Sequence, residues 1–167
     1  MKYIDKLVDM IAWVAKILAA VLLAVMLLVV VFEVGRRYFF GASFPWGNEL
    51  VRFLMVWVAF VGGAAAFKDG GLVFFDMVLK KLPPKVNAIV KLMTNTTILA
   101  FCCYMFYMAL QTNFSRSVVA QIAIGLQVSM AIPYFGITLG FALLIIFSLY
   151  NYSKLIPPLL EKRGQDK

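Results

Sequence analysis

FPWGNELVRFLMVWVAFVGGAAAFKDGGLVFFD, residues 44–76, is the stretch that decides the fold. Its middle is strongly apolar and carries no charge. Glu49 and Arg52 precede this apolar run, and Lys68 and Asp69 follow it. The pattern predicts a membrane-crossing helix with charged residues at both ends. Because charges at the edge of an apolar span are costly, they usually have partners or a function.

The whole chain has the composition of an integral membrane protein. Of its 167 residues, 63% are hydrophobic and only 14% are charged. Several apolar runs approach the roughly 20 residues that cross a bilayer as a helix. We therefore expect an all-α integral membrane protein with four transmembrane helices and short amphipathic interfacial helices.

The residue types present argue against an enzyme. The chain has no histidine, which excludes imidazole ligation of haem or zinc and histidine acid–base catalysis. Cys102 and Cys103 lie inside an apolar run and are interpreted as small apolar fillers. No expected membrane span pairs two carboxylates on one face. We expect no catalytic residues, no metal site and no cofactor in this chain.

The apolar periodicity predicts one membrane domain over residues 1–167. An amphipathic interfacial helix and a surface helix are expected beside the spans, and a polar, irregular connection is expected between the third and fourth spans. The expected segments are an interfacial helix 2–11, spans 12–32, 48–67, 89–110 and 129–150, a surface helix 71–82, the connection 111–127 and a tail 151–167.

The basic residues predict the orientation. With four spans, the N-terminus, the loop after the second span and the tail share one side, which holds 12 of the 16 Lys and Arg residues. The other side holds only Arg36, Arg37, Arg52 and Arg116. By the positive-inside rule both termini are cytoplasmic, and the end with Glu49 faces outward.

Pairs of small residues four positions apart predict close helix packing. The packing is expected either within the chain or against a partner subunit. The pairs are Ala59 with Gly63, Gly62 with Ala66, and Gly136 with Gly140.

Glu49 and Arg52 are candidate contact residues with three readings. They could form a pair within one helix that fixes its depth in the membrane. Glu49 could instead make an ionic contact across helices or subunits, with Arg36 or Arg37 as candidates. Direct contact with a substrate is the third reading.

The remaining candidates lie at both membrane surfaces. Trp46 is interpreted as an interfacial anchor, with contact to a docked periplasmic protein as the alternative. Lys68, Asp69 and Asp76 are interpreted as a cytoplasmic surface feature, with docking of the surface helix as the sharper alternative.

These motifs resemble the small membrane subunit of tripartite ATP-independent periplasmic (TRAP) transporters, the DctQ-like family. The shared order is a first span ending in R-x-x-F, then W-x-x-E-L-x-R, a K-D-G pattern followed by an Asp, and a Pro-bearing fourth span. The matching residues are Trp46, Glu49, Leu50, Arg52, Lys68, Asp69, Gly70 and Asp76. Members often carry a histidine near position 72 and a base near position 74, where this chain has Leu72 and Phe74.

The resemblance implies a role in a bacterial inner membrane. There the small subunit braces a large multi-span subunit, which carries the substrate and sodium sites and moves as an elevator. A periplasmic binding protein delivers an organic acid, such as a C4-dicarboxylate or a sialic acid. The general appearance of the chain is nearest the sialic acid branch.

Two other functions remain open from the residues alone. A self-sufficient homodimeric exporter would use Glu49 as its essential acid, although Glu49 lies at a helix end rather than at mid-membrane. A haem-free membrane anchor of a respiratory enzyme is the other alternative. Partner proteins and membrane lipid are expected, and nucleic acid is not.

Overall fold

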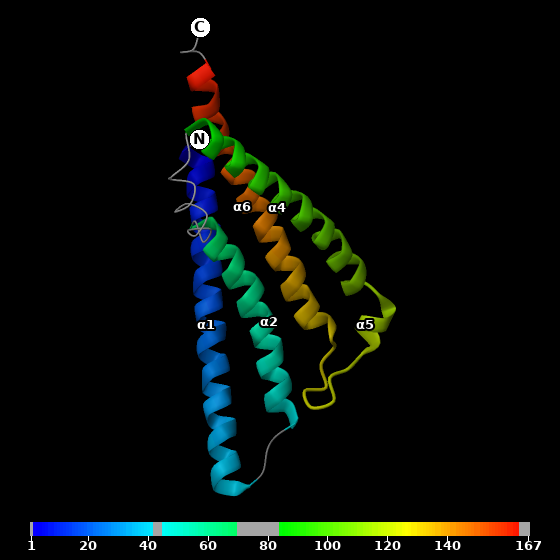
Figure 1. The fold of residues 1–167 in the computed structure, drawn as a ribbon. Helices are drawn as coiled ribbons and strands as arrows, with labels where there is room; N and C mark the ends of the chain where they lie inside the picture. The colour runs from blue at the N-terminus through cyan, green and yellow to red at the C-terminus, as the bar shows by residue number, and fades with distance from the viewer. Residues whose placement is uncertain (1, 42–44, 70–83, 164–167) are drawn as a thin grey trace.

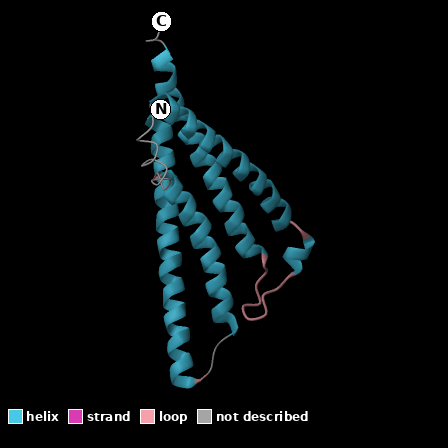
Figure 2. Cartoon of the chain, viewed as in Figure 1, coloured by secondary structure: helices cyan, strands magenta, loops and turns pink. Residues whose placement is uncertain are grey.

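The computed structural model describes residues 2–41, 45–69 and 84–163. In these ranges the chain is helical, with a single isolated β-bridge and no strand (Figure 2). The helices are α1 (Lys2–Phe40), α2 (Pro45–Lys68), α4 (Pro84–Asn113), α5 (Arg116–Ala120) and α6 (Ala131–Arg163). All except α5 are long and apolar enough to cross a membrane. The predicted all-α class with four spans is confirmed.

Helix ends differ from the expected segments at several points, three of which change an expected element. Residues 2–11 continue without a break into the first span, so α1 is one helix of 39 residues. The expected irregular connection 111–127 contains α5. Residues 151–163 of the expected tail extend α6. The expected surface helix 71–82 lies outside the described residues, as do Asp76, Leu72 and Phe74.

The four long helices form a row in the order α1, α2, α6, α4. Each contacts its neighbour in the row, and Figure 1 shows them converging near the N-terminus and spreading apart toward the other end. The converging end is the N-terminal end of the layer, and the spread end is the Glu49 end. The chain therefore forms a splayed layer rather than a closed bundle.

The tightest core lies at the N-terminal end, where α1, α2 and α6 meet. Val8 and Ala12 of α1, Ala64 of α2, and Phe147 and Tyr150 of α6 form one buried cluster. Alanines on α1 and α2 let the backbones approach, and Phe147, which is fully buried, fills the space between them.

Close packing of α2 against α6 depends on two glycines. A Cβ added at Gly136 would lie 2.9 Å from the indole of Trp57, and one at Gly140 would lie 2.5 Å from the Cβ of Phe60. The Trp57 indole also donates a hydrogen bond to the Ile132 carbonyl oxygen (3.2 Å). Gly136 and Gly140 thus lie against α2 within the chain itself.

Polar side chains join α4 to α6 inside the apolar layer. The Asn95 amide donates to the Ser148 carbonyl oxygen, and the Ser148 hydroxyl donates to the Asn95 side-chain oxygen, both at 3.1 Å. Both residues are buried. Such mutual bonding satisfies polar groups that lipid could not.

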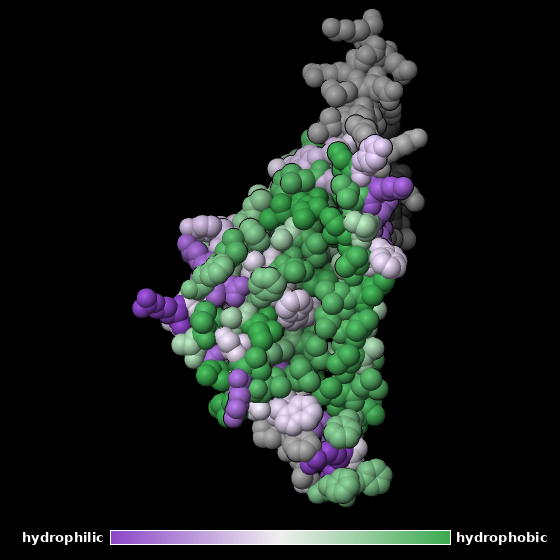
Figure 3. Space-filling view, turned by 180° about the vertical axis from the view of Figure 1, so that it is seen from behind, coloured by the Kyte–Doolittle hydropathy of each residue, from purple (hydrophilic) through white to green (hydrophobic). Residues whose placement is uncertain are grey.

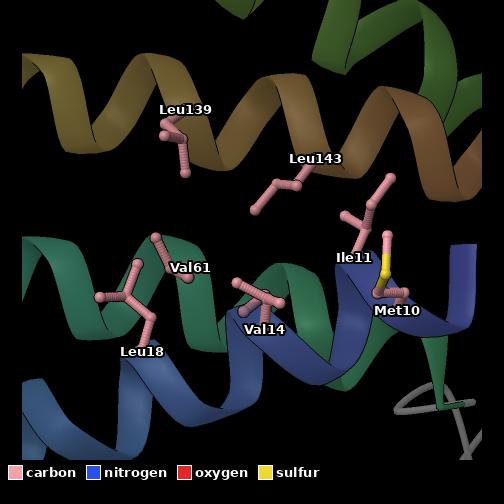
Figure 4. Close-up of a pocket in the computed structure, with 8 residues that line it drawn as sticks. Met10, Ile11, Val14, Leu18, Val61, Leu139 and Leu143 are labelled. Carbon is pink, nitrogen blue, oxygen red and sulfur yellow. The ribbon is translucent and has the colours of Figure 1, made fainter. Parts of the chain in front are cut away.

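Broad apolar surfaces remain on the outside of the layer. Figure 3 shows a mostly hydrophobic face across the middle of the molecule. Between α1 and α6, above α2, lies an apolar groove of about 300 Å³ (Figure 4). Its lining comprises Met10, Ile11, Val14, Ala15, Leu18, Val61, Leu139 and Leu143. These surfaces are suited to lipid or to another membrane protein.

We predict that Gly140→Ala destabilises the chain. The new methyl group would also lie 3.0 Å from the backbone carbonyl carbon of Phe60, so the two helices must separate. Overpacking of this kind costs roughly 1–3 kcal/mol. Thermal unfolding in detergent, followed by gel filtration of the remaining folded protein, measures the loss.

The matched control is Gly63→Ala, because no heavy atom lies within 4 Å of a Cβ built at Gly63. Its melting temperature should equal or exceed that of the parent chain, since alanine favours a helix by up to about 1 kcal/mol. Equal melting temperatures for Gly140→Ala and the parent would contradict the packing argument.

Candidate functional site

Glu49 holds the connection between α5 and α6. Its carboxylate oxygen Oε2 accepts hydrogen bonds from the backbone amides of Gly125 (2.9 Å) and Leu126 (3.0 Å). The side chain is in the first turns of α2, and the two amides that donate to it lie 76 and 77 positions away in sequence. Hydrogen bonds to a charged acceptor contribute about 1.5–3 kcal/mol each. Glu49 therefore fixes this connection against the start of α2.

The connection itself is a compact turn. An antiparallel bridge pairs Ile122 with Ser129, and the amide of Ala123 donates to the Val128 carbonyl oxygen at 2.9 Å. The amide of Gln127 donates back to the Ala123 carbonyl oxygen at 2.8 Å. Gln127 has a φ of 52°, in the left-handed region that tight turns use. The turn thus directs two amides at a single carboxylate.

The basic residues expected near Glu49 do not share its carboxylate. Between the described residues, no ion pair joins Glu49 to Arg52, which is exposed one turn further along α2. Arg36 is half-buried and Arg37 is exposed near the end of α1. The helical pair within α2 is therefore not formed, and the contact that Glu49 makes is to backbone amides instead.

The start of α2 and the end of α1 approach each other at Gly47. A Cβ at Gly47 would lie 3.1 Å from a carboxylate oxygen of Glu33. A hollow of about 180 Å³ lies beside this contact and includes Arg37 and Asn48 in its lining. Trp46, half-buried, precedes Gly47 in the first turn of α2.

Ion pairs join α1 to the end of α2 at the N-terminal end. Lys16 pairs with Asp69 at 2.5 Å, and Lys68 pairs with Asp9. The Tyr150 hydroxyl of α6 donates to Asp5 at 2.6 Å. Lys68 and Asp69, two of the predicted contact residues, thus have partners within the chain, and these contacts link α1 to α2 and to α6 at this end.

The predicted small residues separate into two groups. Gly136 and Gly140 are buried against α2, and a Cβ at Gly62 would lie 3.4 Å from Ala19 of α1. Ala59, Gly63 and Ala66 are instead exposed along one face of α2. The first group packs within the chain, and the second faces outward.

The sequence singles out the charged residues but not the groups that they contact. Asp5 and Asp9 lie four positions apart within the expected interfacial helix 2–11, and this spacing by itself indicates no partner. Gly125 and Leu126 carry no side-chain signal, because they contribute backbone amides. The run Thr94–Thr97 is polar, but nothing in the sequence indicates that Asn95 bonds to Ser148.

The arrangement can hold helices in register. In the described part of the chain, no group of three or more metal-ligating side chains comes together. The charged residues of the site bind backbone amides and one another, so they are positioned to fix the depth and the relative placement of helices.

Comparison with known proteins places these features in a family. The sequence model described as "Tripartite ATP-independent periplasmic transporters, DctQ component" matches residues 26–157. A protein of Haemophilus influenzae named "Putative TRAP transporter small permease protein" is 35% identical over 78 residues. That alignment covers 47% of this chain and 48% of the relative, so the match spans about half the length of each.

We predict that Glu49→Ala frees the turn at residues 125 and 126. Removing the carboxylate leaves two amides without their acceptor, so their hydrogen exchange should accelerate several-fold. Glu49→Gln should preserve most of the protection, because one oxygen accepts both bonds and an amide oxygen can replace it. Hydrogen–deuterium exchange of the full chain, resolved to peptides covering these amides, measures the difference.

Arg52→Ala is the matched control, since Arg52 is exposed on the same helix and makes no ion pair with Glu49. It should leave the exchange of both amides unchanged. Parental protection in Glu49→Ala would show that the carboxylate does not hold the turn.

We also predict a modest coupling between Lys16 and Asp69. Their side chains are 47% and 46% exposed, so solvent screens the pair and a coupling of about 0.2–1 kcal/mol is expected. A double-mutant cycle with Lys16→Met and Asp69→Asn measures it through unfolding in detergent. The coupling should shrink in high salt. A coupling that salt leaves unchanged would rule out a screened ion pair.

Proposed function

Because this chain belongs to the DctQ component family of TRAP transporters, we propose that it braces the large subunit of such a transporter in the membrane. In this proposal the large subunit carries the substrate and sodium sites, and a periplasmic protein delivers an organic acid. Sialic acid and C4-dicarboxylates are the substrate classes that we propose. The match over residues 26–157 is the observation that carries the proposal.

The shape of the helix layer supports a bracing role. Four helices in a row leave broad apolar faces, and the most hydrophobic window of α1 is 0% buried within the chain. A single layer encloses no polar path across the membrane, whereas a carrier needs polar or charged groups along such a path. A fixed layer can instead support a moving neighbour.

The charges of the layer are suited to hold it at one depth. Glu49 is bonded at one end and Lys16, Lys68 and Asp69 at the other. We propose that both termini are cytoplasmic in a bacterial inner membrane, with the Glu49 end outward, because 12 of 16 bases lie on the opposite side.

The alternatives receive less support. In the self-sufficient exporter, Glu49 would have to bind and release protons or cargo, yet its carboxylate holds two backbone amides at a helix end. In the haem-free respiratory anchor, a catalytic partner would have to cover the layer, and the family match favours transport.

We predict that gentle purification from native membranes recovers a larger multi-span protein in equal amount. Proteoliposomes that contain this larger protein should take up the labelled organic acid only when this chain and the periplasmic protein are both present. Replacing external sodium by potassium should abolish the uptake. Radiotracer uptake measures each condition.

The control is the same preparation without this chain, adjusted to the same amount of the large protein. Undiminished sodium-driven uptake in that control would contradict the bracing role. Recovery of a stable homodimer without a larger protein would favour the exporter, and an efflux assay on Glu49→Gln would then follow.

A further inference from the structure

The turn between α5 and α6 presents large apolar side chains outward. Ile124 is 91% exposed and Ile122 is 63% exposed, while Ala123 between them is 1% exposed. Residues that alternate in this way along an extended segment point to opposite sides. Ala123 therefore faces the chain, and the two isoleucines face away from it. Phe114 and Val119 of the same connection are also exposed.

The turn is held in this outward arrangement. The bridge between Ile122 and Ser129 closes it, and Glu49 binds the amides of Gly125 and Leu126 immediately after Ile124. Because these contacts fix the backbone on both sides of Ile124, its side chain cannot fold inward to escape water without breaking them.

Several backbone amides of the turn are hydrogen-bonded within the chain rather than left to water. The amides of Ala123, Gln127 and Met130 donate to carbonyl oxygens of the same turn at 2.8–2.9 Å. Those of Gly125 and Leu126 donate to Glu49. Internal bonding of this kind lowers the cost of bringing these parts of the backbone close to lipid.

The turn also lies at the right depth. The candidate span that follows it, Ala131–Ser153, has 23 residues. At about 1.5 Å per residue this apolar part of α6, which itself continues to Arg163, is roughly 35 Å long, close to the thickness of a hydrocarbon layer of about 30 Å. A span that begins at Ala131 places the preceding turn next to the bilayer edge. Exposed aromatic residues, Tyr38, Phe39 and Phe40, end α1 at the same end of the chain.

From these observations we propose that Ile122 and Ile124 insert into the interfacial region of the bilayer at the Glu49 end. The turn is then a rigid lipid contact that Glu49 positions, and its partner is the lipid surface rather than another protein. Arg116 is the one charged residue of the connection between Asn113 and Ala131, and a single exposed base is compatible with the headgroup layer. This proposal does not depend on the transported substrate or on the bracing role.

Spin-label accessibility tests the proposal on the full chain. The two native thiols are first replaced by Cys102→Ala and Cys103→Ala. A nitroxide is then attached through Ile124→Cys, or in a second variant through Ile122→Cys. Each protein is placed in nanodiscs of phosphatidylethanolamine with a minor fraction of phosphatidylglycerol. Collision of the label with oxygen, which concentrates in lipid, is compared with collision with a water-soluble nickel chelate.

The matched control is Gln121→Cys, because Gln121 is an exposed polar residue beside Ile122. We expect the oxygen-to-nickel collision ratio at Ile124 and Ile122 to exceed that at Gln121 several-fold. The same measurement on the chain purified with its natural partners should give the same ratio.

Two results would overturn the proposal. A ratio at both isoleucines equal to that at Gln121 would place the turn in water. Low collision with both reagents, arising only in the natural assembly, would show that a protein covers the turn. Gel-filtration profiles identical to that of the parent chain establish that each variant is folded. If one isoleucine variant does not fold, the other alone suffices for the comparison.

Discussion

The close approach of α2 and α6 at Gly140 is the contact on which the helix arrangement depends. Lipid tails are as apolar as leucine, so apolar helices gain little by leaving lipid for one another. Association then requires dense packing and satisfied polar groups. Gly140 allows the Phe60 backbone to come within a distance that no side chain permits. Once α2 and α6 are paired, α1 is added through alanine contacts and Asp5, and α4 through Asn95.

Polar contacts supply what apolar packing cannot, namely a definite register. Two apolar helices can slide with little change in energy, but the mutual bonds of Asn95 and Ser148 exist at one register only. At the N-terminal end, Lys68 with Asp9 and Lys16 with Asp69 do the same for α1 and α2. At the other end Glu49 holds a turn by its backbone. The layer is thus fixed at both ends and open along its faces.

An open layer with fixed ends connects the structure to the proposed role. A support for a moving neighbour needs a shape of its own and a surface left for contact. The exposed stripe of Ala59, Gly63 and Ala66 and the apolar groove between α1 and α6 are such surfaces. The rigid turn after α5 differs from them, because its isoleucines lie at the edge of the bilayer rather than along a helix face.

The sequence by itself determined the helical class and the four spans, because apolar length and charged boundaries depend only on neighbouring residues and on the thickness of the bilayer. It also singled out Glu49, Lys68, Asp69, Gly136 and Gly140 as candidate contact and packing residues. It could not identify their partners. Glu49 binds two backbone amides 76 and 77 positions away, and backbone amides leave no mark in a sequence. Only the tertiary structure decided between a bundle and a row, because that choice depends on which helix faces approach closely, and apolar faces of similar composition look alike until they are packed.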